Sequence, residues 1–178
     1  MNFSEASQAI TGQIGTVLSR VSAEEVEAVC DRLAGATAVF VTGEGRSGLV
    51  GRCFAMRLTH LGLRVHFVGD STAPALRPGE VLVAVSGAGG TAVTQTVARL
   101  ARQVGGQVIA VTADRGSPLA SLAGLTLVVP ADLDDITQYG RSLFEQCALI
   151  ALDAVALQLQ QRLGQTREQM DARHANLE

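Results

Sequence analysis

The sequence contains no lysine and no tryptophan, and aromatic residues make up only 3% of it. All 14 of its basic residues are therefore arginines. Without lysine, the protein can form no Schiff base with a carbonyl substrate, and it lacks the P-loop lysine that binds nucleoside triphosphates. Few aromatic side chains and a net charge of −3 also leave no stacking platform and no basic patch. Nucleic acid is therefore not expected as a partner.

Cysteines and long apolar runs are also scarce. Cys30, Cys53 and Cys147 are far apart and lie among apolar residues, which predicts buried thiols in a reducing compartment rather than disulfides or a metal site. No apolar run approaches the ~20 residues that a membrane-spanning helix needs. The N-terminal region carries Glu5 and no apolar secretory core. We expect a soluble, cytoplasmic protein with no membrane partner.

The pattern that is present is that of one α/β domain. Residues 1–178 have the length and the 47% hydrophobic content of a single domain. Residues 1–35 have the apolar spacing of two helices, and residues 36–163 alternate apolar strands with helical segments. This alternation predicts a five-stranded parallel sheet with helices on both faces. Residues 164–178 are polar, and their composition predicts a frayed terminus.

The expected elements follow from the apolar runs and from the glycines and prolines between them. The strands are expected at 38–42, 64–68, 81–85, 108–111 and 125–129. The helices of the core are expected at 49–61, 93–104, 118–122 and 138–163. Ser22 and Glu25 have the spacing of a capping box for the second N-terminal helix. The first N-terminal helix either packs on the sheet edge or is free to contact another subunit.

Two glycine-rich loops follow the first and third expected strands, at 43–48 and 86–91. Glycines let such a loop turn sharply and approach a ligand closely, and Thr91 is placed to begin a helix whose free N–H groups favour an anion. Ser47 is placed to bind the same phosphate from the other loop. Arg46 either adds positive charge or is an ordinary solvated or interface arginine. The candidate phosphate-binding residues are Gly45, Arg46, Ser47, Ser86, Gly87, Ala88, Gly89, Gly90 and Thr91.

Two other interpretations of these loops stay open at this point. The loop at 86–91 has the composition of an ordinary strand-to-helix turn. Gly43, Gly45 and Gly48 also match the dinucleotide fingerprint, with Asp70 near the position of the ribose-binding acid. A separate candidate is Glu145, whose stripe on the long helix is otherwise apolar. A carboxylate in that position is a general base, or it is simply exposed at the start of a helix or paired with an arginine.

Several segments resemble one known family. The segments at 43–50 and 85–91 are similar to those of the sugar isomerase (SIS) domain, a flavodoxin-like fold that binds phosphosugars. The segments at 54–62, 140–146 and 172–178 resemble, more specifically, the 6-phospho-3-hexuloisomerases. Together these segments extend over nearly the whole chain.

The resemblance implies an isomerase that interconverts 3-hexulose 6-phosphate and fructose 6-phosphate without a metal or a nucleotide cofactor. It implies a homo-oligomer, a tetramer or a dimer, in which the tail at 164–178 contacts a neighbouring subunit. Glu145 matches the proposed base of the family, and His60 matches a histidine that assists ring opening or proton transfer. His174 would then complete a site shared between subunits, whereas His66 is expected to be structural.

The chain departs from the family at Ala88 and Gly90, where further polar residues are usual. We expect this change to weaken phosphate binding without abolishing it, since a neutral hydrogen bond contributes only ~1 kcal/mol. Three alternative functions remain at this stage. They are another phosphosugar aldose–ketose isomerase, a phosphosugar-binding SIS protein without catalysis, and a dinucleotide-binding oxidoreductase.

Overall fold

The structure is a computed structural model that describes residues 1–132, 137–139 and 141–177. Its strands are β1 Val39–Gly43, β2 Val65–Phe67, β3 Val81–Val85, β4 Gln107–Thr112 and β5 Leu125–Val128. Its helices are α1 Phe3–Leu18, α2 Ala23–Ala34, α3 Gly45–His60, α4 Ala92–Gln103, α5 Pro118–Leu122, α6 Ser142–Arg162 and α7 Arg167–Asp171. The strands form one parallel sheet in the order β2-β1-β3-β4-β5, which confirms the predicted five-stranded α/β fold.

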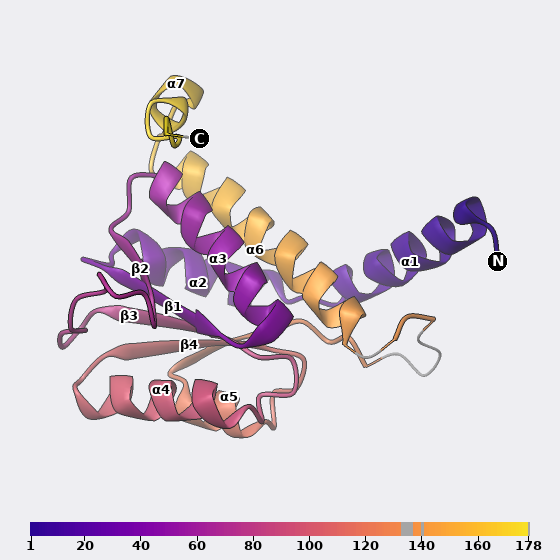
Figure 1. The fold of residues 1–178 in the computed structure, drawn as a ribbon, viewed down its shortest axis with the longest axis horizontal. Coiled ribbons are helices and arrows are strands. Elements are labelled where there is room, and N and C mark those ends of the chain that lie inside the picture. The colour runs from indigo at the N-terminus through magenta and orange to yellow at the C-terminus, as the bar shows by residue number, and fades with distance from the viewer. Residues whose placement is uncertain (133–136, 140, 178) are drawn as a thin grey trace.

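The sheet separates two apolar layers of different thickness, with α4 and α5 on one face and α2, α3 and α6 on the other (Figure 1). Alternate residues of each strand point to opposite faces. Toward α3 and α6 the sheet presents branched side chains such as Val83 and Ile109, and toward α4 it presents large side chains together with small ones such as Ala84 and Ala110. The larger core therefore lies beneath α3 and α6, and it holds these two helices in place.

The strand order determines where a ligand can bind. The order 2-1-3-4-5 is that of flavodoxin-like sheets, in which the chain changes direction between β1 and β3. In open parallel sheets, ligands bind outside the carboxyl ends of the strands at such a switch point. The two glycine-rich loops leave β1 and β3 at that edge, because Gly43 pairs in register with Val85.

Helix α6 is the long core helix. It is the one described helix that is long and apolar enough to cross a membrane by length and composition, which corrects the expectation that no segment reaches that size. Half of this apolar segment is buried inside the domain, and α6 packs against α1, α2 and α3. The apolar composition of α6 is therefore explained by its place in the core.

Several local predictions were wrong. Helix α3 begins at Gly45 instead of at residue 49, so the loop residues Arg46 and Ser47 lie in its first turn. Ser22 caps α2, but the carboxylate of Glu25 does not complete a capping box and instead binds the N–H of Val128 and the side chain of Arg115. A contact across the sheet edge has thus replaced a local one.

The third correction concerns the C-terminal segment, which does not fray throughout. Helix α7 has a complete capping box from Thr166 and Gln169, and it lies beyond the ends of α3 and α6 in Figure 1. Helix α6 begins at Ser142, whereas the helix was predicted to start at residue 138. Gly140, within that predicted helix, and Glu178, at the end of the tail motif, lie outside the described residues.

The cysteines also differ from the prediction in part. Cys30 and Cys147 are buried, and burial raises the pKa of each thiol to about 11. Both are therefore neutral and unreactive at neutral pH. Cys53 is exposed on α3, so the expectation of a buried thiol was wrong there. All three cysteines are free.

Candidate active site

The two glycine-rich loops lie side by side at the carboxyl edge of the sheet, and close packing of the backbone shapes the first. A Cβ atom on Gly43 would lie 2.9 Å from the carbonyl oxygen of Val85, and one on Gly48 would lie 2.5 Å from the carbonyl oxygen of Gly43. Neither position accepts a side chain. Gly45 has a φ of 56°, which favours glycine for a different reason. These three glycines bring the start of α3 against the end of β3.

In the second loop, several carbonyl groups are occupied and most of the N–H groups are free. The carbonyl of Gly87 accepts from the N–H of Ala113 and the hydroxyl of Thr112, and the carbonyl of Gly89 accepts from the N–H of Leu119. These bonds hold the loop in one shape before any ligand binds. The following N–H groups have no acceptor among the described residues: Gly87, Ala88, Gly90 and Thr91. An anion is the natural partner for such a group of donors.

Three of the helices that begin at this edge have no side-chain cap. Among the helices that the structure describes, α1, α2, α5 and α7 have a side-chain N-cap hydrogen bond. Helices α3, α4 and α6 have none, although their N-cap residues are Glu44, Thr91 and Arg141. The free N–H groups and positive dipole ends of α3 and α4 therefore flank the two loops. We call the loops at 43–48 and 86–91, with these two helix starts, the cradle.

The cradle also holds hydroxyl groups. Ser86 is buried, and its Oγ lies 3.1 Å from Oγ1 of Thr91, so the two hydroxyls point to one place. Thr91 is at the N-cap position, as predicted, but its hydroxyl pairs with Ser86 and does not cap the helix. Ser47 is partly buried in the first turn of α3. These hydroxyls are donors for phosphate oxygens.

Glu145 lies in the first turn of α6, next to the cradle. Its neighbour Phe144 packs on Gly87, where a Cβ atom would lie 2.8 Å from the ring, so this contact fixes the start of α6 against the second loop. The side chain of Glu145 is 14% exposed, and its Oε2 lies 2.5 Å from Nε of Arg46. No hydrogen bond of good geometry to a described residue accompanies this ion pair. Arg46 is 60% exposed, and its Nη1 donates to Oγ of Ser142 at 2.9 Å.

His60 and His174 lie together, but at the opposite end of the molecule. Gly45 and His60 are the first and last residues of α3, so they are separated by roughly 22 Å at 1.5 Å per residue. The rings of the two histidines stack with centroids 5.0 Å apart, and Arg173 donates to the carbonyl of His60 at 2.9 Å. Burial, followed by His174 and Arg57 nearby, lowers the pKa of His60. Within one subunit, neither histidine reaches the cradle.

Asp70 has a different role from the one that a dinucleotide site requires. Its carboxylate accepts from Nη2 of Arg52 at 3.0 Å, on the rim of an apolar cavity of about 450 Å³. The sheet also has the flavodoxin-like order and not the dinucleotide-binding order 3-2-1-4-5-6. Both observations oppose the oxidoreductase. Within the described residues no group of three or more His, Cys, Asp or Glu side chains is placed to hold a metal ion.

The sequence did not indicate every residue that shapes the site. Phe144 was not singled out, and the closeness of Gly87 to its ring depends on a contact over 57 positions of sequence that no local pattern shows. The hydrogen bond from Arg46 to Ser142 was missed for the same reason. His66 is in β2, and its ring lies against that of Phe40 with the centroids 5.2 Å apart and the planes tilted by 38°.

Comparison with known proteins identifies the class. Residues 32–156 match the SIS domain family. This match extends over well more than half of the chain, and the chain therefore belongs to the SIS domain family.

More specific relatives agree with this class. A 3-hexulose-6-phosphate isomerase of Mycobacterium gastri is 37% identical over 175 residues, covering 95% of this chain and 88% of the relative. A 3-hexulose-6-phosphate isomerase of Bacillus subtilis is 34% identical, covering 95% of each chain. The fold also matches the crystal structure of a hypothetical protein from Methanococcus jannaschii, with a TM-score of 0.87 and 33% identity over 98% of this chain and 99% of the other. That structure was taken to infer a molecular function of 3-hexulose-6-phosphate isomerase.

Proposed function

We propose that this protein is an isomerase that interconverts D-arabino-hex-3-ulose 6-phosphate and fructose 6-phosphate. The observation that carries the proposal is a preformed phosphate cradle beside one partly buried carboxylate, Glu145. The relatives named 3-hexulose-6-phosphate isomerase support the choice of sugar, because they share nearly the whole length of the chain. In this proposal the reaction is a step of formaldehyde fixation by the ribulose monophosphate route. The protein acts in the cytoplasm, a reducing compartment in which free thiols such as its three cysteines are usual.

The chemistry needs one base and one route for protons. A proton is removed from the carbon beside the carbonyl, an enediolate forms, and the proton returns to the neighbouring carbon. Glu145 is the base in this proposal, because it is the carboxylate next to the cradle on the apolar face of α6. Ser47, Ser86, Thr91 and the free N–H groups of the second loop hold the phosphate. The reaction requires no metal and no nucleotide.

The second acid–base group comes from another subunit in this proposal. His60 is roughly 22 Å from the cradle along α3, so in its own subunit it is too far to touch the sugar. In a homo-oligomer, His60 of a neighbouring copy assists ring opening or carries a proton between sugar oxygens. His174 stacks on His60 and accompanies it into the shared site.

The outer faces of α3 and α6 support such an assembly. Leu49 and Met56 on α3, and Ile150 and Leu157 on α6, are exposed apolar side chains on two adjacent helices. A second copy is a natural cover for such a face. A twofold axis perpendicular to α3 makes the two copies of this helix antiparallel, and the His60 end of one then lies beside the cradle of the other.

The proposal is tested by a coupled assay with the purified protein. D-arabino-hex-3-ulose 6-phosphate is supplied without any added cofactor, and formation of fructose 6-phosphate is measured. We expect turnover that a chelator does not reduce. NAD and NADP are the control ligands, and neither should raise the midpoint of thermal unfolding, since a ligand that binds the native state must stabilise it. No turnover with this sugar would reject the proposed reaction.

A further inference from the structure

The ion pair between Arg46 and Glu145 is unusual for a site that needs a free base. The arginine occupies a carboxylate oxygen that a base would need for taking a proton from the substrate. The contact nevertheless has few supports, because Glu145 has no hydrogen bond of good geometry from any described residue to its Oε2. Arg46 is the more exposed partner, and the hydroxyl of Ser142 is its other contact. Arg46 is therefore the group that can move.

Arg46 also lies beside the cradle. It precedes Ser47 in the first turn of α3, where the helix has no side-chain cap and its N–H groups face an incoming anion. A phosphate in the cradle offers an arginine two or three oxygens and up to two negative charges, whereas Glu145 offers one oxygen. The guanidinium thus has a better partner close by whenever the cradle is filled.

We propose that Arg46 is a positioning residue that pairs with Glu145 in the empty protein and moves to the phosphate when substrate enters. The phosphate end of the substrate then releases the carboxylate that acts on the sugar end. This inference rests on the proposed function, and it adds a coupling between phosphate binding and the base. Without a phosphate, the base stays paired, so a sugar that lacks the phosphate reacts poorly even at saturation.

The test is a double-mutant cycle on binding of inorganic phosphate, measured by calorimetry at fixed ionic strength. The four proteins are the wild type, Glu145→Gln, Arg46→Gln and the double variant. If phosphate must take Arg46 from Glu145, then Glu145→Gln removes the competitor and tightens phosphate binding by about two- to five-fold, the range of a partly exposed ion pair. In the Arg46→Gln background, Glu145→Gln should increase the affinity for phosphate by a smaller factor.

The two gains in phosphate affinity, with and without Arg46, distinguish an exchange of Arg46 between Glu145 and phosphate from simple repulsion between Glu145 and phosphate. Removing a negative charge near the cradle favours phosphate in any case, and Glu145 without its arginine repels phosphate more strongly than a paired one. If Arg46 does not move, the gain is therefore equal or larger in the Arg46→Gln background, and that result would overturn the proposal. Failure of the wild type to bind phosphate at millimolar concentration would overturn it too.

The matched control is Arg52→Gln. Arg52 is another exposed arginine of α3 with one carboxylate partner, Asp70, at 3.0 Å. In this background Glu145→Gln should give the full gain, and a gain reduced as much as with Arg46→Gln would mean that general charge, and not exchange, explains the data. The cycle needs no turnover. The coupled assay with wild-type protein decides the reaction separately, so the two proposals can fail independently.

Discussion

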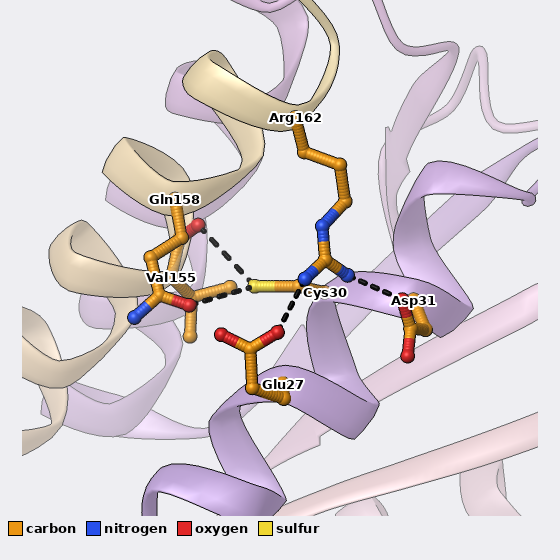
Figure 2. Close-up of polar contacts among 6 residues, drawn as sticks. All are labelled: Glu27, Cys30, Asp31, Val155, Gln158 and Arg162. Atoms are coloured by element: carbon orange, nitrogen blue, oxygen red, sulfur yellow. Dashed lines mark hydrogen bonds and ion pairs between the residues drawn. The ribbon is translucent and has the colours of Figure 1, made fainter.

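Two arginine–carboxylate contacts of α6, at opposite ends of the helix, differ in which partner is protected from water. At the far end, Arg162 binds Glu27 and Asp31 of α2, as Figure 2 shows. There the arginine is the less exposed partner, at 30%, against 54% and 76% for the two carboxylates. At the cradle the order is reversed, with Glu145 at 14% and Arg46 at 60%.

This difference in exposure indicates that the contact of Arg162 is the lasting one of the two. Arg162 bridges two acids on α2, and its hydrogen bond with Glu27 raises its pKa, so it remains charged and held. Beside it, Sγ of Cys30 lies 3.7 Å from the carbonyl oxygen of Val155 and 3.8 Å from Oε1 of Gln158, so the same α2–α6 contact also holds a buried thiol (Figure 2). We call Arg162, Glu27 and Asp31 the clamp. At the cradle, Glu145 is held by Arg46, which in our proposal moves away when a phosphate binds.

The largest expected effect comes from the protected acid of the cradle. Glu145→Gln keeps the size of the side chain but removes the base, so turnover should fall by roughly 10²–10⁴-fold without weaker binding of the phosphosugar. Turnover is measured with the coupled assay. Incorporation of solvent deuterium into the substrate carbon, which reports proton abstraction, should disappear.

A conservative change at His60 gives a comparison for the turnover of Glu145→Gln. His60→Asn should lower turnover less, because water partly replaces a group that only moves protons between oxygens. If Glu145→Gln keeps near-native turnover, Glu145 is a structural acid like those of the clamp, and His60 or His174 of another subunit becomes the candidate base.

A smaller effect is expected from the hydroxyls of the cradle. Ser86→Ala and Thr91→Val each remove one donor from a preformed site, so each should weaken binding of fructose 6-phosphate by about five-fold, equivalent to ~1 kcal/mol. The fold should be unaffected, which thermal unfolding checks. Unchanged affinity in both variants would mean that phosphate binds elsewhere on the protein.

Most of the fold, and the cradle, could be predicted from the sequence because both depend on local patterns. The run at 81–85 forms β3 and the segment at 118–122 forms α5 with the expected bounds. Apolar runs buried on both faces and glycine-rich turns act within a few residues, so they are visible in one dimension. The adjacency of the two loops then follows from the parallel strand order.

The relations that could not be predicted join residues far apart in the sequence. Arg46 meets Glu145 across 99 positions, and Arg173 meets the carbonyl of His60 across 113. The polar composition of the tail predicted fraying, because composition does not show that Arg173 and Gln165 also bind one another. Charged surface residues have many possible partners, and the folded geometry selects among them.

The contact between the tail and His60 is expected to depend on pH. The pKa of His60 lies below its ordinary value of 6.5, first because of burial and then because of His174 and Arg57. The unfolded chain therefore binds the proton more readily, and stability should be lost as the pH falls below about 6.5, until the lowered pKa is passed. We expect a lower midpoint of thermal unfolding and faster proteolysis after residue 164 at about pH 5.5 than at about pH 7.5.

The control for this prediction is His60→Gln, which removes the titrating ring. In this variant the loss of stability between the two pH values should be reduced. An equal loss in both proteins would show that other groups, and not His60, cause the acid sensitivity.

The smallest effect on the site is expected from the clamp itself. Arg162→Gln removes the arginine of the clamp, and the two acids that remain are well exposed, so water can solvate them and the midpoint of thermal unfolding should fall only slightly. Phosphate affinity and turnover should not change, because the clamp lies at the end of α6 farthest from Glu145. Arg46→Gln is the matched comparison, with weaker phosphate binding and little change in the unfolding midpoint. If Arg162→Gln lowers turnover as much as Arg46→Gln does, then the two ends of α6 are coupled, and the division into a permanent and an exchangeable arginine contact is wrong.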